Sequence, residues 1–99
     1  MGRWQALIDD IIADLEAETP GEGLRTRIDQ KIWKAETRAS KLAAPATRAE
    51  KSTHRKREFQ AALRLTLGAL RVHDPSNEIW AEALHLLEDP RLGYVTEER

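Results

Sequence analysis

The groups best suited to acid–base or metal chemistry are three histidines and many carboxylates, so their spacing is considered first. Glu82 and His85 have the Glu-x-x-His spacing that carboxylate-bridged di-metal bundles use, and Asp89 follows one turn later. Such a site needs a second pair of this type and two more inward-facing glutamates. Glu50 and His54 are the only other pair nearby. We therefore interpret Glu82, His85 and Asp89 as a solvated acidic helix face, and metal binding remains a third hypothesis.

Other catalytic signatures are missing from the sequence. There is no cysteine, which excludes disulfides, thiolate metal sites and thiol nucleophiles. Gly21 and Gly23 follow an expected helix, whereas the glycines of a nucleotide-binding fingerprint follow a strand. The serines lie in no nucleophile motif. We expect neither enzymatic activity nor a cofactor.

Positive charge is concentrated in the middle of the chain. The basic candidates for phosphate contacts are Arg48, Lys51, Arg55, Lys56, Arg57, Arg64 and Arg71. Residues seven apart on a helix drift by only about 20°, so Arg57, Arg64 and Arg71 share one polar lane, which also holds Gln60. This pattern makes nucleic-acid binding the alternative function. Two observations oppose it, an isoelectric point near 6.3 and the lack of a known DNA-binding motif.

The net charge of −1 conceals a strong segregation of charge. Residues 1–23 carry one basic and six acidic side chains, a net charge of −5. Residues 24–71 carry thirteen basic and four acidic side chains, a net charge of +9, and residues 72–99 return to −5. Such asymmetry reflects either charge pairing between packed helices or a binding surface. We favour internal pairing, because the acidic ends nearly cancel the basic centre.

Hydrophobic periodicity predicts a single all-α domain, a four-helix bundle with a long central third helix and a short packed tail. The expected helices span residues 3–18, 24–43, 47–72 and 75–89, and the tail spans residues 90–99. A capping box at 47–50 begins the third helix. Asp74 is the expected N-cap of the fourth helix, with Pro75 at its first helical position.

The sequence predicts neither a signal peptide nor a membrane-spanning helix. Met1 leads into a charged, amphipathic segment instead of the apolar core of a signal peptide. No apolar run approaches the ~18 residues of a membrane span. We expect a cytoplasmic protein with no membrane partner.

The third helix is apolar around most of its circumference from Phe59 to Val72, so other helices, from this chain or a second copy, should surround it. Gly68 would let a neighbouring helix approach closely. Trp33 lies opposite the apolar stripe of its own helix and is therefore either exposed or covered by something else. We predict a small protein–protein interaction module, self-associating as a homodimer or regulating a larger partner, with contact residues Trp33, Leu65, Gly68 and Val72.

Overall fold

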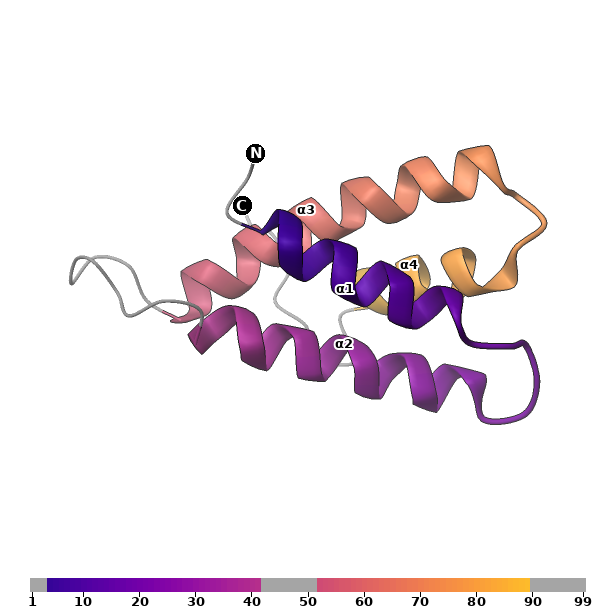
Figure 1. Cartoon of the computed structure of the whole chain (residues 1–99), viewed down its shortest axis with the longest axis horizontal. Helices are drawn as coiled ribbons and strands as arrows, with labels where there is room; N and C mark the ends of the chain where they lie inside the picture. The colour runs from indigo at the N-terminus through magenta and orange to yellow at the C-terminus, as the bar shows by residue number, and fades with distance from the viewer. Residues whose placement is uncertain (1–3, 42–51, 90–99) are drawn as a thin grey trace.

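The computed structural model describes residues 4–41 and 52–89, which form four helices and no strand (Figure 1). These are α1 (Gln5–Glu16), α2 (Leu24–Lys41), α3 (Ser52–His73) and α4 (Glu78–Glu88). The predicted all-α fold is confirmed, and α3 is the longest of the four helices. The predicted capping box and the packing of the tail concern residues outside the described part. Within that part, no helix is both long enough and apolar enough to cross a membrane.

The core forms where the apolar stripes of the four helices meet. Each helix contributes residues at three- and four-residue spacing, which places them on one face. The most deeply buried large side chains include Leu15 of α1, Ile32 of α2, Phe59 of α3 and Leu87 of α4. Trp4 meets Phe59 edge-to-face with ring centroids 6.0 Å apart, and this contact ties the start of α1 to α3.

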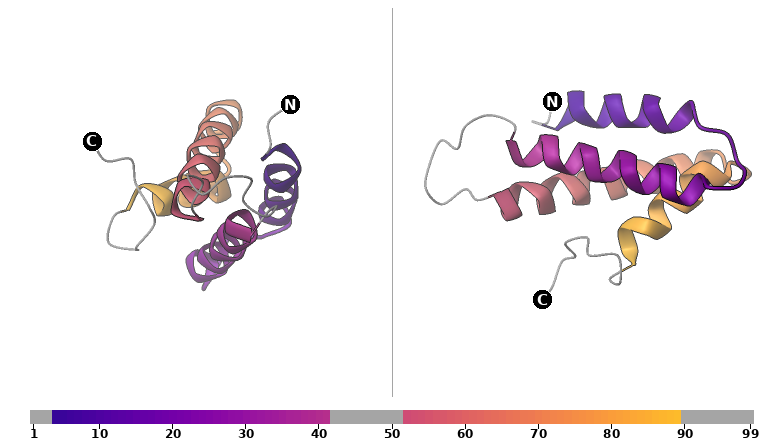
Figure 2. Two further views of the ribbon diagram at one scale, coloured as in Figure 1. Left: turned by 90° about the vertical axis from the view of Figure 1, so that its left-hand side faces the viewer. Right: turned by 90° about the horizontal axis from the view of Figure 1, so that it is seen from below.

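Helix α3 packs against α2 and α4, with which it makes its most extensive contacts (Figures 1 and 2). Helices α2 and α3 are antiparallel neighbours (Figure 1). Both partners lie on the side of α3 that carries Phe59, Leu63 and Leu67. Among the described residues, helices therefore cover α3 on one side, whereas the sequence predicted cover around most of its circumference.

A tight turn joins α1 to α2 and depends on glycine. Gly23 adopts φ +82°, in the left-handed region that side chains disfavour. Its carbonyl accepts from the backbone N–H of Arg27 at 3.0 Å, which starts the first turn of α2. The turn returns the chain beside α1, so the two helices pack side by side.

The start of α4 differs from the prediction. Asn77 is the N-cap, and its side-chain oxygen accepts from the backbone N–H of Ile79 at 2.9 Å. Asp74 instead closes a turn, because its carbonyl accepts from the N–H of Asn77 at 3.1 Å. The prediction that Asp74 is the N-cap of α4 was therefore wrong. Asp and Asn are equally good caps, and the sequence offered both within four residues.

Candidate functional site

The side of α3 that points away from the core is apolar and exposed. Leu65 is 77% exposed and Val72 is 79% exposed, whereas Leu63 and Leu67 are fully buried on the opposite side. With spacings of four, three and four residues, Ala61, Leu65, Gly68 and Val72 form one stripe, which we call the outer face of α3. An exposed apolar stripe on a helix face is a candidate docking surface.

Gly68 lies between these two side chains, and nothing in the described structure requires glycine at this position. A Cβ built at this position would meet no atom within 4 Å, apart from the backbone of its own helix. Glycine inside a helix costs about 1 kcal/mol relative to alanine. What glycine does offer here is a flat surface that allows another helix to approach the backbone.

Three arginines run beside the outer face. Arg57, Arg64 and Arg71 repeat every seven residues, and the apolar residues Leu65 and Val72 each directly follow one of them. Arg57 and Arg71 are exposed, and Arg64 is half-buried. No ion pair joins these three side chains, which we call the arginine lane, to any carboxylate in the described part of the chain. The outer face is thus apolar along its centre and positively charged along one edge.

Arg55 does not belong to this surface, which corrects its selection as a nucleic-acid contact. Its side chain is buried at 6% exposure, and its Nε donates to the carbonyl of Ser40 at 3.1 Å. Its Nη2 donates to the same carbonyl. Arg55 therefore satisfies a carbonyl in the last turn of α2 and joins α2 to α3. Of the other predicted phosphate contacts, Lys56 is half-buried, and Arg48 and Lys51 lie outside the described residues.

A buried polar pair, unforeseen from the sequence, lies nearby between α2 and α3. Gln60 is fully buried, and its Nε2 donates to Oε2 of Glu36, which is also buried. Burial raises the pKa of the Glu36 carboxyl, although the hydrogen bond from Gln60 and the charge of Lys56 oppose this. Gln60 Oε1 has no hydrogen-bond partner in the described structure. Helical spacing could have predicted that Gln60 is buried. It lies three residues before Leu63 and seven before Leu67, which puts it on the core-facing side of the helix.

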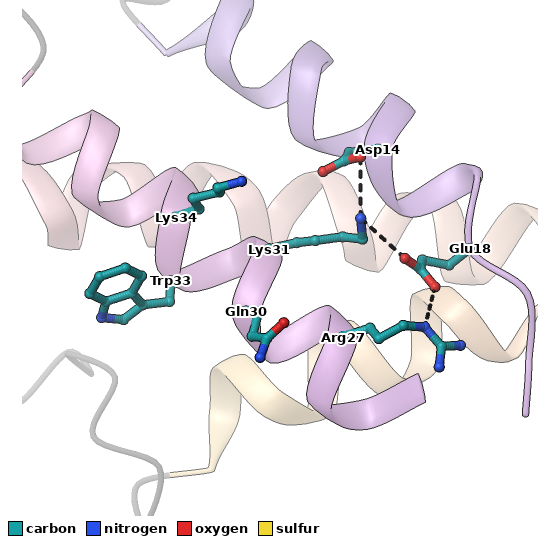
Figure 3. A pocket seen from close by; sticks show the side chains of 7 residues that line it. All are labelled: Asp14, Glu18, Arg27, Gln30, Lys31, Trp33 and Lys34. Carbon is teal, nitrogen blue, oxygen red and sulfur yellow. Dashed lines mark hydrogen bonds and ion pairs between the residues drawn. The ribbon is translucent and has the colours of Figure 1, made fainter. Parts of the chain in front are cut away.

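Ion pairs between α1 and α2 confirm the predicted internal charge pairing for this half of the molecule (Figure 3). Glu18 binds Arg27 Nε at 2.7 Å and Lys31 Nζ at 3.1 Å, and Lys31 also reaches Asp14 at 3.3 Å. Hydrogen bonds from Arg27 and Lys31 lower the pKa of Glu18, and the bond to Glu18 raises the pKa of Lys31. These groups line an open hollow of about 430 Å³. Carboxylates hold two of the three cations that line the hollow, Arg27 and Lys31, whereas Lys34 forms no ion pair among the described residues.

Trp33 borders the same hollow and is 63% exposed, which decides between the two alternatives that the sequence left open. In Figure 3 its ring points away from Asp14 and Lys31. Trp33 belongs to α2, and α2 packs against the side of α3 that is opposite the outer face. The structure therefore brings Leu65, Gly68 and Val72 together and leaves Trp33 on a separate surface.

The acidic residues of α4 are also partly used within the chain. Arg25 lies 3.5 Å from Glu82 and 3.5 Å from the buried Asp89, so these carboxylates join α4 to α2. His85 is exposed on the same helix. Among the described residues, no group of three His, Cys, Asp or Glu side chains could hold a metal ion. The metal hypothesis therefore has no structural support in this region.

No protein-family model, curated protein or solved structure matches this chain. Among the described residues, the outer face of α3 has the two most exposed of the large apolar side chains, Leu65 and Val72, beside the arginine lane.

Proposed function

We propose that this protein is a non-enzymatic interaction module that binds another polypeptide through the outer face of α3. The observation that carries the proposal is the exposure of Leu65 and Val72 on the back of a helix whose other side is in the core. Neither side chain stabilises the single chain much, because both remain mostly in water. Burial against a partner helix would use this apolar area, and Gly68 would allow close approach.

Site-specific photo-crosslinking tests the interaction role. A photoreactive amino acid at position 65 or 72 should form a discrete protein adduct in the native cell, and also with the purified chain at high concentration where the partner is a second copy. The matched control places it at Thr26, which is exposed on α2. In the chain that carries the photoreactive group at position 72, Leu65→Gln should abolish the adduct without unfolding the chain, since residue 65 is exposed. Adducts that form equally at all three positions, or at none, would refute the interaction role.

Nucleic-acid binding remains a second candidate because the arginine lane is unpaired among the described residues. Lys and Arg contacts to phosphates give affinity that falls steeply with salt. If the lane binds nucleic acid, the chain should be retained on a polyanion column at about 50 mM salt. Arg57→Glu with Arg64→Glu should then abolish retention. Arg55 is unsuitable for this test because its substitution would disturb the α2–α3 contact.

A further inference from the structure

We infer that the outer face of α3 binds the outer face of α1 in a second copy of this chain. This inference rests on the interaction role proposed above and names the partner. Charge, spacing and side-chain size support it on two helix faces that the described residues leave uncovered.

The exposed side of α1 is acidic and has small apolar side chains. Its core-facing residues are Leu7, Ile8, Ile11 and Leu15. On the opposite side lie Ala6, Asp9, Ala13 and Glu16, all exposed, which we call the outer face of α1.

The acidic residues of this face form no ion pair in the described part of the chain. Asp9 accepts a hydrogen bond from Gln5 at 2.8 Å. Neither Asp9 nor Glu16 forms an ion pair in the described structure, whereas Asp10 and Asp14 on the flank of α1 pair with α2.

The spacing of the charges matches between the two outer faces. Asp9 and Glu16 are seven residues apart on α1, and Arg64 and Arg71 are seven residues apart on α3. Seven residues correspond to about 10.5 Å along either helix. When the two helices lie side by side, both carboxylates can therefore meet an arginine at the same time.

Side-chain size matches as well. Leu65 and Val72 project from α3 at a seven-residue interval, and Ala6 and Ala13 have the same interval on α1. Large side chains packed against alanine, with Gly68 between them, allow the helix axes to come close. The contact therefore combines a dry apolar centre with ion pairs along its edge, as is usual at protein interfaces.

Pairing of α3 with α3 of a second copy lacks this complementarity. In an antiparallel pair, the arginine lanes of the two helices would face each other, and like charges repel. In a parallel pair, Arg57 and Arg64 would lie against Ala62 and Ala69, which carry no charge. Of these arrangements, pairing with α1 of the second copy brings two carboxylates with the same seven-residue spacing to the arginine lane.

The charges fix the relative direction of the two helices. When α3 of one copy lies antiparallel to α1 of the next, the arginine lane and the carboxylates are on the same side of the contact. Helices α1 and α3 run in the same general direction along the long axis of the molecule, so the two copies are then antiparallel (Figures 1 and 2). Two copies joined in this way form a dimer in which the contact is heterologous.

A charge-swap experiment with the full chain tests this pairing by analytical ultracentrifugation from about 5 to about 500 µM. The wild type should form a dimer that added salt weakens. Arg64→Glu with Arg71→Glu should raise the dissociation constant at least about tenfold, and so should Asp9→Lys with Glu16→Lys. An equimolar mixture of the two double variants should restore dimerisation to within about threefold of the wild type. Lys34→Glu with Glu78→Lys, at exposed sites on other helices, is the matched control and should leave the dimer unchanged.

Each other result overturns the inference. A wild type that stays monomeric up to about 500 µM excludes a second copy as the partner. If a photoreactive group at position 65 still forms an adduct with a different protein, the interaction role survives and only the partner is wrong. Stronger association in a mixture of the arginine-reversed variant with the wild type than in the wild type alone would indicate antiparallel α3–α3 pairing. Weakening by both double variants without rescue in the mixture would show that these charges do not meet. Circular dichroism of every variant verifies that it is folded.

Discussion

Replacing Gly68 with alanine should make the single chain more stable and its association weaker. The new Cβ would meet no atom outside its own helix within 4 Å, and Gly68 is not among the described glycines with positive φ. The free energy of unfolding should therefore rise by about 0.5–1 kcal/mol, the usual gain for alanine over glycine inside a helix. For a chain of this length, that corresponds to a rise in Tm of roughly 2–8 °C.

The same methyl group should interfere with a partner helix packed on the outer face of α3. Overpacking a close contact costs about 1–2 kcal/mol, or roughly a 5- to 30-fold rise in the dissociation constant. Urea unfolding at low micromolar concentration measures the first effect, and ultracentrifugation measures the second. Ala69→Gly, at the neighbouring exposed position, is the control and should lower stability by a similar amount with little effect on association. Unchanged association of Gly68→Ala would refute the close approach, and a loss of stability would refute the open space around Gly68.

Three further predictions concern the buried polar groups and the cap of α4. Glu36→Gln should stabilise the protein at pH 7 by about 1–2 kcal/mol, because it removes a buried charge and can donate to Gln60 Oε1. Burial raises the pKa of Glu36 in the folded state, so the wild type loses stability as pH rises from the ordinary glutamate pKa to the raised value. Urea unfolding at several pH values should therefore show the advantage of the variant shrinking as pH falls through this window. Arg55→Ala should lower the free energy of unfolding, measured in urea, by about 2–3 kcal/mol, because a carbonyl of α2 loses its hydrogen-bond partner. The control Arg57→Ala should change it by no more than about 0.5 kcal/mol. Equal losses for the two variants would contradict the burial of Arg55. Asn77→Ala should cost about 1 kcal/mol by the same measurement, and no loss would show that α4 is capped by another residue.

Sequence periodicity was enough to predict the helices and their inward faces. Leu7, Ile11 and Leu15 on α1 are buried as their three- and four-residue spacing required. It also placed Leu65, Gly68 and Val72 on one side of α3 beside the arginine lane. Spacing fixes the direction of each side chain around its own helix axis, and this needs no knowledge of neighbouring helices.

The role of each charged residue could not be predicted in the same way. Arg55 and Arg57 belong to one basic run, yet Arg55 is buried against α2 and Arg57 is exposed. Gln60 was assigned to the polar lane, but it lies in the core and binds Glu36. Composition cannot distinguish a cation that pairs within the fold from one available to a partner, because the difference depends on what lies opposite.

The sequence by itself therefore determined an all-α chain, the apolar stripes of its helices and the seven-residue repeat of arginines along α3. Only the tertiary structure decided which stripes are covered, which cations are already paired and that Trp33 lies apart from Leu65 and Val72. The physical reason is that helix formation and face direction are set by neighbours within a few turns. Burial and ion pairing are set by residues brought together from distant parts of the chain by the turns between helices.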